Sequence, residues 1–481
     1  MAQQKLSMPT WSSRTVFLLA AIGSAVGLGN LWKFPYVAGE NGGGAFVLVY
    51  LACILLIGVP VLIAELTLGR SARANPIQAM HQHTQQDRAN KLWVGLGVNG
   101  MLAGILILSF YSVITGWSLA YFFDSLQGDF LQIPPAQAEQ HFAALLASPW
   151  QLLFWHTLVM IITTSIVARG LRSGIEKAIN IMLPGLLLIL MVLLIYAVGT
   201  GAFAESFAFL FTPDFSKLSW QGVLVAMGHA FFTLSIGMAA MMVYGAYLDQ
   251  RTSIVKASLV IAVADTLIAL LAGLVIFSIV FANQLPPSSG PGLLFQTLPM
   301  AFGQMWGGWF FGTLFFALVF FAALSSAISL LEPTLSWLEH NRGIGRMKGA
   351  LGLGGLVWLI GIGTVLSFNQ WSELTLIGDK TVFALLDFLT ANILLPAGGL
   401  LICLYLAWVM ARPRRQAELR LEGIWQTLLL WDLRWVAPLA ILWVFVSNLF
   451  SASSTALWAF LSVLVLYGFF VAYQTRSREE A

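Results

Sequence analysis

The chain has 481 residues, of which 59% are hydrophobic and only 9% are charged, and its mean hydropathy is +0.84. This composition lies outside the range of soluble globular domains and indicates a polytopic membrane protein. The net charge of +3 is small and resides in loops, so it gives no support to a nucleic-acid partner. Cys53 and Cys403 fall inside apolar stretches, where a small buried residue is expected rather than a disulfide partner.

Twelve apolar stretches are long enough to cross a bilayer, since about 20 apolar residues span its hydrocarbon core. They begin near Ser13, Gly43, Leu92, Pro149, Gly174, Gln221, Ile254, Gly308, Lys348, Thr381, Trp435 and Thr455. The longest hydrophilic segments, at about 125–148, 283–305 and 411–431, have the length of loops. We therefore expect a single membrane domain over residues 1–481, with a short amphipathic helix outside the membrane from Pro135 to Ala147.

The basic residues predict the orientation of the chain, because short cytoplasmic loops carry an excess of Lys and Arg. With the N-terminus in the cytoplasm, all 24 basic residues lie on the inner side except Lys33, Lys217 and Lys380. Both termini are therefore predicted to be cytoplasmic. The sequence contains no Asn-x-Ser/Thr sequon and no cleavable signal peptide, which favours a multi-pass protein of a bacterial inner membrane.

Two spans, the first and the sixth, contain segments that interrupt a membrane helix: Gly23 to Asn30 and Phe231 to Gly237. In hydrocarbon an unpaired peptide group costs several kcal/mol, so unwound backbone persists only where protein, water, an ion or a substrate satisfies it. A half-helix also presents amides that favour an anion and, at its other end, carbonyls that favour a cation. Both segments predict a binding site in mid-membrane, with close packing through Gly23-xxx-Gly27 as the alternative for the first.

Five spans separate the two interruptions, which predicts a five-plus-five repeat. A unit with an odd number of spans enters the membrane from the opposite side, so the repeat is expected to be inverted. The first repeat would cover about 12–200 and the second about 220–411, with helices 11 and 12 added over about 431–474. The predicted fold is an all-α polytopic membrane protein of twelve transmembrane helices, with helices 1 and 6 unwound at mid-membrane.

Three specific motifs stand near the N-terminus and read Trp11-Ser-Ser-Arg14, Ala21-Ile-Gly-Ser-Ala-Val-Gly-Leu-Gly-Asn-Leu-Trp-Lys-Phe-Pro-Tyr36 and Glu40-Asn-Gly-Gly-Gly-Ala-Phe46. Further motifs are Phe110-Tyr111, Gly116-Trp117, Phe231 to Gly237 and Ala322-Ala-Leu-Ser-Ser326. With the ten-plus-two layout of spans, nearly the whole chain resembles the neurotransmitter:sodium symporter family, in particular its bacterial transporters of the leucine-transporter type. The resemblance implies a sodium-coupled transporter of small molecules and not an enzyme.

The resemblance also implies two sodium ions held by hard oxygen atoms, as an alkali cation requires. The first sodium site would use Ala25, Asn30, Thr233 and Asp265, where the family usually has Asn at the last position. The second sodium site would use Gly23, Val26, Ala322, Ser325 and Ser326. On the residues alone, a protonated, hydrogen-bonded group is the alternative for the carboxylate, and helix packing is the alternative for the two serines.

For the organic substrate, the resemblance implies a carboxylate near the first interruption and an amine near the carbonyls of both. Members that carry monoamines have Asp where this chain has Gly27, so an amino acid is the expected substrate. The mostly apolar surroundings favour a neutral, medium-to-large hydrophobic amino acid, although such a pocket discriminates single methylenes weakly. The residues expected around the substrate are Ser24, Ala25, Leu28, Gly29, Ile107, Tyr111, Phe232, Thr233, Ser235, Met238, Ala239, Ser326, Ala327 and Leu330.

Asp265 also bears on the use of chloride. Animal members use chloride to balance the sodium charge, and some bacterial members use a Glu at the position of Ala269. The carboxylate of Asp265, beside Tyr50 and Ser235, would supply this charge, so no chloride requirement is expected. Protonation of Asp265 in the empty return step would give proton countertransport.

The resemblance implies gates on both sides of the site. On the outside, Lys33 and Asp387 match an ion-pair gate, with Tyr111 and Phe232 as an inner lid. Lys replaces the commoner Arg, so bidentate geometry is lost while the attraction of charges remains. 

On the inside, Met8 and His340 occupy the positions of a frequent Arg–Asp pair, so that pair is not expected here. Weaker candidates for the inner closure are Lys5, Arg14 and Glu339, and Trp11 could close the inside by packing.

Three buried ionisable residues complete the predicted site. Glu65 in the second span resembles a glutamate that accepts hydrogen bonds from the unwound backbone of span six. His229 stands where the family commonly has Gln, and we interpret it as a packing residue, with a proton relay as the alternative. Glu332 before Pro333 lies near the inner cavity without an assigned role.

The sequence thus favours sodium-coupled import of a neutral amino acid by alternating access, with spans one, two, six and seven rocking against spans three, four, eight and nine. A non-transporting sodium-dependent amino-acid sensor and a symporter of a small amino-acid-like osmolyte are the alternatives. The expected partners are the amino acid and the lipid bilayer, and the expected assembly is a monomer or a homodimer.

Overall fold

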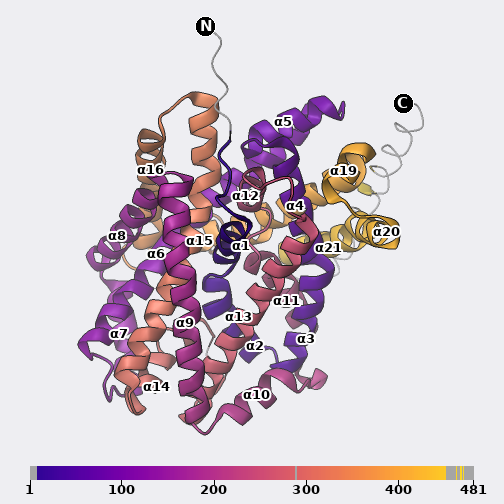
Figure 1. The fold of residues 1–481 in the computed structure, drawn as a ribbon. Helices are drawn as coiled ribbons and strands as arrows, with labels where there is room; N and C mark the ends of the chain where they lie inside the picture. Colours follow the sequence, from indigo (N-terminus) through magenta and orange to yellow (C-terminus); the bar gives the residue numbers. More distant parts are fainter. Residues whose placement is uncertain (1–7, 288–289, 451–461, 463–465, 468–469, 471–481) are drawn as a thin grey trace.

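A computed structural model describes residues 8–287 and 290–450, together with residues 462, 466, 467 and 470. All of its extended regular elements in these ranges are helices, arranged as a bundle whose long members run between two ends (Figure 1). The predicted all-α polytopic fold is confirmed. The twelfth predicted span, near Thr455, lies outside the described residues.

The first half of the chain contains the first five spans and the loop helices between them. Its helices are α1 (Arg14–Ala25), η1 (Gly29–Lys33), α2 (Phe34–Glu40), α3 (Gly44–Cys53), η2 (Ile54–Gly58), α4 (Val59–Ala72), α5 (Pro76–Gln86), η3 (Lys91–Val94), α6 (Gly95–Gln127), α7 (Pro135–Ala147), α8 (Pro149–Ala168), η4 (Leu171–Glu176) and α9 (Lys177–Gly199). Helix α7 matches the amphipathic helix predicted between spans three and four.

The second half contains the remaining described helices. Its helices are α10 (Phe203–Phe211), η5 (Phe215–Lys217), α11 (Trp220–Thr233), α12 (Ala240–Ala246), α13 (Ile254–Ala282), η6 (Gly290–Leu293), α14 (Thr297–Gln304), α15 (Gly308–Arg342), α16 (Arg346–Ser367), α17 (Val382–Phe388), η7 (Leu389–Leu394), α18 (Leu395–Leu404), η8 (Tyr405–Val409), α19 (Arg412–Leu419), α20 (Gly423–Trp431), η9 (Asp432–Val436) and α21 (Ala437–Phe450).

The spans predicted to be broken are broken. Within the described residues, nine helices are long and apolar enough to cross a membrane, and a tenth span is the pair Arg14–Ala25 and Gly29–Glu40, bent by 50°. The sixth span consists of the two shorter helices α11 and α12, separated by residues 234–239. Helix extends further into the predicted interruptions than the sequence suggested. At the two breaks, residues 26–27 and 234–239 lie outside a helix.

Polar side chains at the helix starts account for several boundaries. Ser13, Asn75, Ser219 and Ser253 each accept a hydrogen bond from a backbone amide in the first turn of the helix that follows. Thr381 does the same for α17. An N-cap of this kind contributes about 1 kcal/mol and satisfies an amide that the helix itself leaves unpaired.

Glycines bring the short helix α12 close to α4. A β-carbon on Gly69 would lie 1.8 Å from the carbonyl oxygen of Met242, and one on Gly245 would lie 2.6 Å from that of Leu66. The two glycines thus let each backbone approach the other directly, as small residues do in membrane helix pairs. This contact fixes the half-helix that follows the second break.

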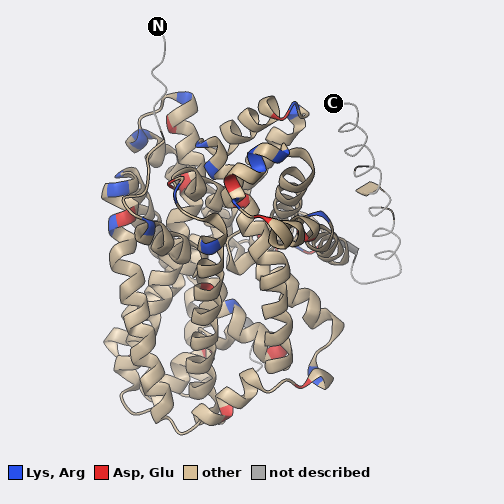
Figure 2. Cartoon of the chain, turned by 45° about the vertical axis from the view of Figure 1, so that its right-hand side comes forward, with Lys and Arg blue, Asp and Glu red and all other residues tan. Residues whose placement is uncertain are grey.

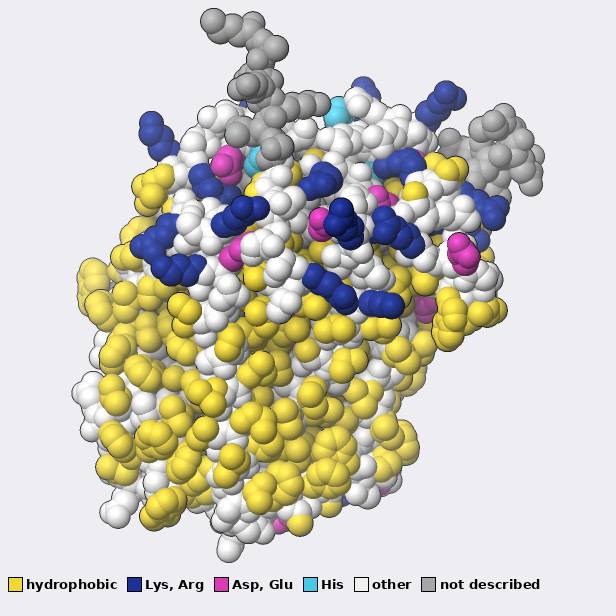
Figure 3. Space-filling view, in the orientation of Figure 1, with side chains coloured by type: hydrophobic (Ala, Val, Ile, Leu, Met, Phe, Trp, Pro, Cys, Tyr) yellow, Lys and Arg dark blue, Asp and Glu magenta, His cyan; other side chains and the backbone are white. Residues whose placement is uncertain are grey.

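Charge divides the bundle into two unlike ends. Lys and Arg gather at the end that holds α5, α19 and the start of the described chain, while a broad apolar surface covers the rest of the face shown (Figures 2 and 3). We call this the basic end, and it contains Arg414 of α19 and Arg70, which contacts Glu418 of the same helix. Helices α7, α10 and α14 lie at the opposite end (Figure 1).

Candidate functional site

The first break has backbone groups that neighbouring side chains satisfy. Helix α1 ends at Ala25, and the amide of Gly27 then donates to Oδ1 of Asn30 over 3.0 Å. The amide of Leu28 donates to the hydroxyl of Tyr111 over 3.2 Å. Polar partners from within the protein therefore keep this segment unwound, as the argument from hydrocarbon requires.

The second break depends on a buried carboxylate and on unusual backbone angles. Ser235, Gly237 and Ala239 have φ values of 52°, 82° and 62°, which lie in the left-handed region. Such angles cost non-glycine residues about 1–3 kcal/mol each and are concentrated at functional sites. Glu65 accepts hydrogen bonds from the amides of Gly237 (2.8 Å) and Met242 (3.3 Å), which confirms the role expected for it.

The residues predicted for the first sodium site lie together between the two breaks. Asn30 donates from Nδ2 to Oδ1 of Asp265 (2.8 Å) and to the Asp265 carbonyl oxygen (3.0 Å). The hydroxyl of Thr233 donates to Oδ2 of the same carboxylate over 2.9 Å. All three side chains are fully buried, and Ala25 is nearly so. One carboxylate among neutral oxygen groups suits a singly charged hard cation better than a divalent one.

The residues predicted for the second sodium site also converge. The hydroxyl of Ser326 donates to the carbonyls of Ser24 (3.1 Å) and Val26 (3.3 Å), and that of Ser325 donates to the carbonyl of Ala322 (2.9 Å). Gly23 faces Ser325, because a β-carbon there would lie 3.6 Å from that of Ser325. The end of α1 and one turn of α15 thus form a second cluster of oxygen atoms. Among the described residues, no three His, Cys, Asp or Glu side chains group as a transition-metal site would require.

A cavity lies against both breaks and contains most of the predicted substrate residues. Its lining is Ala25, Gly27, Gly29, Ile107, Tyr111, Phe232, Ser235, Met238, Ser326 and Leu330. Five predicted residues stand behind this wall instead, because they bind or pack against other groups: Ser24, Leu28, Thr233, Ala239 and Ala327.

Gly27 controls the space at one side of this cavity. A β-carbon at this position would lie 2.5 Å from Oγ of Ser326 and 2.7 Å from the hydroxyl of Tyr111. A side chain at this position would therefore overlap the hydroxyl groups of Ser326 and Tyr111, which line the cavity. The sequence singled out Gly27 for lacking a carboxylate, and the structure adds that even a methyl group would collide.

A second cavity, of about 290 Å³, lies toward the opposite end and is lined by Lys33, Glu40, Asn41 and Phe232, among others. Phe232 lines both cavities, so its ring stands between them, as the predicted lid requires. The ammonium group of Lys33 lies 4.9 Å from the centre of this ring. In the described part of the chain no ion pair within 4.0 Å joins Lys33 to Asp387, because the Lys33 side chain lies over Phe232 instead. The ion-pair gate stays a prediction.

Trp11 packs against the segment that follows the second break. Its backbone amide donates to the carbonyl of Tyr247 and its indole Nε1 donates to the carbonyl of Tyr244, both over 3.1 Å. The side chain is only 7% exposed, and its ring contacts both tyrosine rings edge-on. Trp11 is therefore packed as the predicted closure requires, and its role as a closing element stays a prediction. The alternative candidate Lys5 lies outside the described residues.

An ion-pair network that the sequence reasoning missed lies next to Trp11. Arg346, the first residue of α16, lies 2.5 Å from Oε2 of Glu332 and 3.1 Å from Oε2 of Glu339. The hydroxyl of Tyr247 donates to Oε1 of Glu332 over 2.7 Å. Glu332 is fully buried in a membrane span, where a carboxylate is expected to have a cationic or hydrogen-bonding partner. This expectation could have predicted a partner for Glu332 from the sequence.

Met8 and His340, which stand where the family frequently has an Arg–Asp ion pair, make contacts with Ser336 instead. The hydroxyl of Ser336 donates to the sulfur of Met8 over 3.9 Å, and Nδ1 of His340 lies 2.8 Å from the Ser336 carbonyl. His229 is 1% exposed, and its ring packs against Phe34 and Tyr50. This environment agrees with the interpretation of His229 as a packing residue.

Two facing breaks, two clusters of buried oxygen atoms and a cavity between them define an ion-coupled secondary transporter. The sequence profile of the sodium:neurotransmitter symporter family matches residues 8–144 and 137–473. The chain belongs to this family and is a sodium-dependent symporter. The family consists of secondary transporters, so the protein is not an enzyme.

Relatives and a solved structure agree with this assignment. The chain is 36% identical to an uncharacterised sodium-dependent transporter, YhdH, of Bacillus subtilis, over 91% of this chain and 97% of that protein. It is 32% identical to an uncharacterised sodium-dependent transporter of Haemophilus influenzae, over 92% of this chain and 98% of the relative. The crystal structure of MhsT in complex with L-phenylalanine superposes with a TM-score of 0.84 at 42% identity, over 92% of this chain and 99% of MhsT.

Proposed function

We propose that the protein imports a neutral, hydrophobic L-amino acid together with sodium by alternating access. The observation that carries this proposal is the cavity lined by Gly27, Met238 and Leu330, which adjoins both clusters of oxygen atoms. An amino acid there would present its carboxylate to the first break and its side chain to the apolar wall. MhsT, which shares the fold, binds L-phenylalanine in its crystal structure.

The substrate carboxylate would lie near the amides of Leu28 and Gly29 and the hydroxyl of Tyr111. Because Leu28 already donates to Tyr111, the carboxylate would enter by replacing or joining this hydrogen bond. The amine would face carbonyls of Ala25 and Phe232. The carboxylate would also be close to the sodium held by Asn30, so ion and substrate would share one site.

Sharing a site couples the two gradients. By linkage, each of two ligands that strengthens the other's binding does so by the same factor. We propose two sodium ions, one at Asn30, Thr233 and Asp265 and one at Ser325 and Ser326. The inverted repeats over about 12–200 and 220–411 would supply the rocking motion, since the two broken spans occupy equivalent places in them.

Asp265 supports transport without chloride. Its carboxylate is fixed by Asn30 and Thr233 and supplies a negative charge inside the first sodium site. A bound chloride is then not needed to balance the sodium, and protonation of Asp265 in the empty carrier would return a proton. Sodium-driven uptake that is unchanged when gluconate replaces chloride is expected, whereas strict chloride dependence would contradict this part of the proposal.

The basic end would be cytoplasmic. Short cytoplasmic loops are rich in Lys and Arg, and Figures 2 and 3 show these residues gathered at one end. The cavity beside Lys33 would then open toward the outside and Trp11 would close the inside. We propose residence in a bacterial inner membrane with both termini in the cytoplasm.

Uptake into proteoliposomes tests the proposal directly. With sodium outside and none inside, accumulation of a labelled hydrophobic amino acid such as phenylalanine or leucine is expected, and collapse of the gradient by a sodium ionophore should abolish it. Binding without accumulation would indicate a sensor. Accumulation of a small osmolyte such as glycine betaine, with no uptake of hydrophobic amino acids, would indicate the osmolyte alternative.

A further inference from the structure

Helix α19 (Arg412–Leu419) joins parts of the bundle that the transport cycle would separate. It lies at the basic end, beside α4 and α5 (Figure 1). Helix α4 is the inner half of span two, which belongs to the moving group. Helix α5 instead packs on α6 of the static group, since a β-carbon on Gly97 of α6 would lie 2.6 Å from the carbonyl oxygen of Pro76.

One side of α19 holds the moving group through Arg70. This side chain is fully buried, and its Nε lies 2.7 Å from Oε2 of Glu418. Its other nitrogens donate to the carbonyls of Glu418 (2.6 Å) and Thr252 (2.5 Å). Thr252 precedes α13, so Arg70 ties α19 to the inner ends of spans two and seven together.

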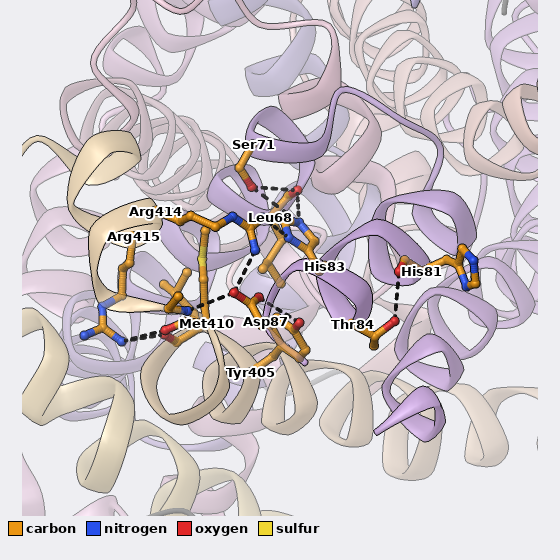
Figure 4. A network of polar contacts seen from close by, with 12 residues as sticks. Leu68, Ser71, His81, His83, Thr84, Asp87, Tyr405, Met410, Arg414 and Arg415 are labelled. Carbon is orange, nitrogen blue, oxygen red and sulfur yellow. Dashed lines mark hydrogen bonds and ion pairs between the residues drawn. The ribbon is translucent and has the colours of Figure 1, made fainter. Parts of the chain in front are cut away.

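The other side of α19 holds α5 through Arg414. Nη1 of Arg414 lies 2.8 Å from Oδ1 of Asp87, and Nη2 lies 2.6 Å from Nδ1 of His83 (Figure 4). Asp87 also accepts hydrogen bonds from the amide of Ala411 and the hydroxyl of Tyr405, both over 3.0 Å. The start of α19 and the end of span ten are thus anchored on one buried carboxylate.

These contacts admit only the neutral form of His83. A guanidinium group donates hydrogen bonds and accepts none, so Nδ1 of His83 must be the acceptor toward Arg414. The ring proton then sits on Nε2, which lies 2.9 Å from the Leu68 carbonyl oxygen and 3.3 Å from the Ser71 hydroxyl. A second proton would have to sit on Nδ1 and point at a positive charge. His83 therefore joins α5 to α4 and α19 only while it is uncharged.

The charged groups around His83 come from two helices. Helix α19 supplies Arg414 and Glu418, and Asp87 follows the last residue of α5, while η8 contributes the ring of Tyr405 at 5.9 Å. Burial of the ring lowers the pKa of His83, and Arg414 lowers it further. The carbonyl of Leu68, Asp87 and Glu418 act in the opposite direction without reversing the result.

We propose that α19, with Arg414 held by His83 and Arg70 held by Glu418, is a latch that keeps the basic end closed and is released when His83 is protonated. Because the latch would face the cytoplasm, this inference rests on the proposed orientation and transport cycle. Acidification of the cytoplasm would then favour inward opening. The protein would gain a response to internal pH that is separate from any proton carried by Asp265.

The sign of the pH effect follows from linkage. An open latch leaves His83 in water with an ordinary pKa near 6.5, whereas the closed latch keeps the pKa lower. The closed state is therefore favoured above about pH 6.5 and loses its advantage as the pH falls below it. Each unit between the two pKa values corresponds to about a tenfold change in the opening equilibrium.

Hydrogen–deuterium exchange of the full-length protein at matched pH tests the latch. At pH 5.5, one unit below the ordinary histidine pKa, the wild type should exchange faster than His83→Gln in α1, α12 and α19, by up to about tenfold. At pH 7.5 the two proteins should exchange alike, since glutamine keeps a donor and an acceptor without titrating. Arg414→Gln should exchange faster at both pH values, with α16 as the internal reference.

Equal exchange of wild type and His83→Gln at pH 5.5, or no effect of Arg414→Gln at pH 7.5, would overturn the latch. If His83→Gln does not fold, the pH dependence of wild-type exchange in α19 relative to α16 is compared with that of Arg414→Gln instead. A latch requires the ratio of exchange in α19 to exchange in α16 to rise at low pH in the wild type and to stay constant in Arg414→Gln. Sodium-driven uptake is measured in parallel, so failure of the proposed transport is distinguished from failure of the latch.

Discussion

Asn30 connects the first break to the first sodium site at the level of single atoms. Its Oδ1 accepts from the amide of Gly27 while its Nδ2 donates to Asp265. The same amide oxygen is the group that the sodium proposal assigns to the ion. Ion binding and the shape of the broken backbone are therefore expected to change together.

Replacing Asn30 by Ala should abolish sodium-dependent substrate binding while the protein still folds. Loss of an oxygen ligand and of a hydrogen bond to a charged group, worth about 1.5–3 kcal/mol, should weaken sodium binding by roughly 10- to 100-fold. Scintillation-proximity binding with and without sodium measures the effect. Asn283→Ala is the matched control, because the Asn283 side chain donates to the carbonyl of Ile279 and belongs to neither proposed ion site. Wild-type binding in Asn30→Ala would contradict the site assignment.

Asp265→Asn tests the fixed charge separately. The substitution keeps the size of the side chain but removes its negative charge, and it replaces one of the two acceptor oxygens with an amide donor. We expect the apparent sodium affinity to fall by at least about tenfold, which corresponds to about 1.4 kcal/mol. Stimulation of the variant by added chloride would support the role of charge balance. An unchanged sodium dependence of uptake would show that the carboxylate is not part of the ion site.

At the scale of helices, close glycine contacts place the short half-helix α12. Gly69→Ala would push a β-carbon against the Met242 carbonyl at 1.8 Å, so a loss of about 1–3 kcal/mol of stability or more is expected. Gly352→Ala in α16 is the control, because no atom lies within 4 Å of the added carbon. Thermal unfolding in detergent should separate the two variants, and equal melting temperatures would contradict the close packing of α4 and α12.

The loop helix α7 is held on α6 by a pH-sensitive contact. Nε2 of His141 lies 3.0 Å from Oδ2 of Asp124, and this hydrogen bond raises the pKa of His141 against the opposing effect of burial. The protonated form is thus favoured in the folded state. Its contribution to stability is fully present below the ordinary His pKa of about 6.5 and is lost as the pH rises through the higher, folded value.

His141→Gln should therefore lower the melting temperature most at pH 6 and progressively less toward pH 8. Thermal unfolding of wild type and variant across this range measures the difference. His81→Gln, on the exposed face of α5, is the control and should leave the pH profile unchanged. A difference between wild type and His141→Gln that does not depend on pH would contradict the role assigned to the contact.

At the scale of the whole molecule, we expect Trp11 and the network of Arg346 to keep the basic end closed. Trp11→Ala removes the ring that packs on Tyr244 and Tyr247, so we expect a shift toward the inward-open state. Exchange in α12 should rise and sodium-dependent binding from the outside should weaken several-fold. Trp306→Ala, whose side chain is 86% exposed, is the control. Unchanged exchange in α12 would exclude Trp11 as a closing element.

The sequence by itself determined the class of fold and the composition of the site. Long apolar stretches can satisfy their backbone only as helices, so their number and length predict the spans. Glycine and Asn30 inside one such stretch predict the first break, and the motif that carries them predicts which residues gather around it. These features can be recognised from the local sequence, without knowledge of the residues that pack against them.

Tertiary structure alone decided which groups pair across the bundle. Arg346 and Glu332 are 14 residues apart, and Arg70 and Glu418 are 348 residues apart, so no local pattern connects either pair. Lys33 illustrates the same limit, because its ammonium group lies over the ring of Phe232, which belongs to the sixth span. A buried charge requires a partner, and the sequence can predict this requirement. The packing of distant helices determines which residue the partner is.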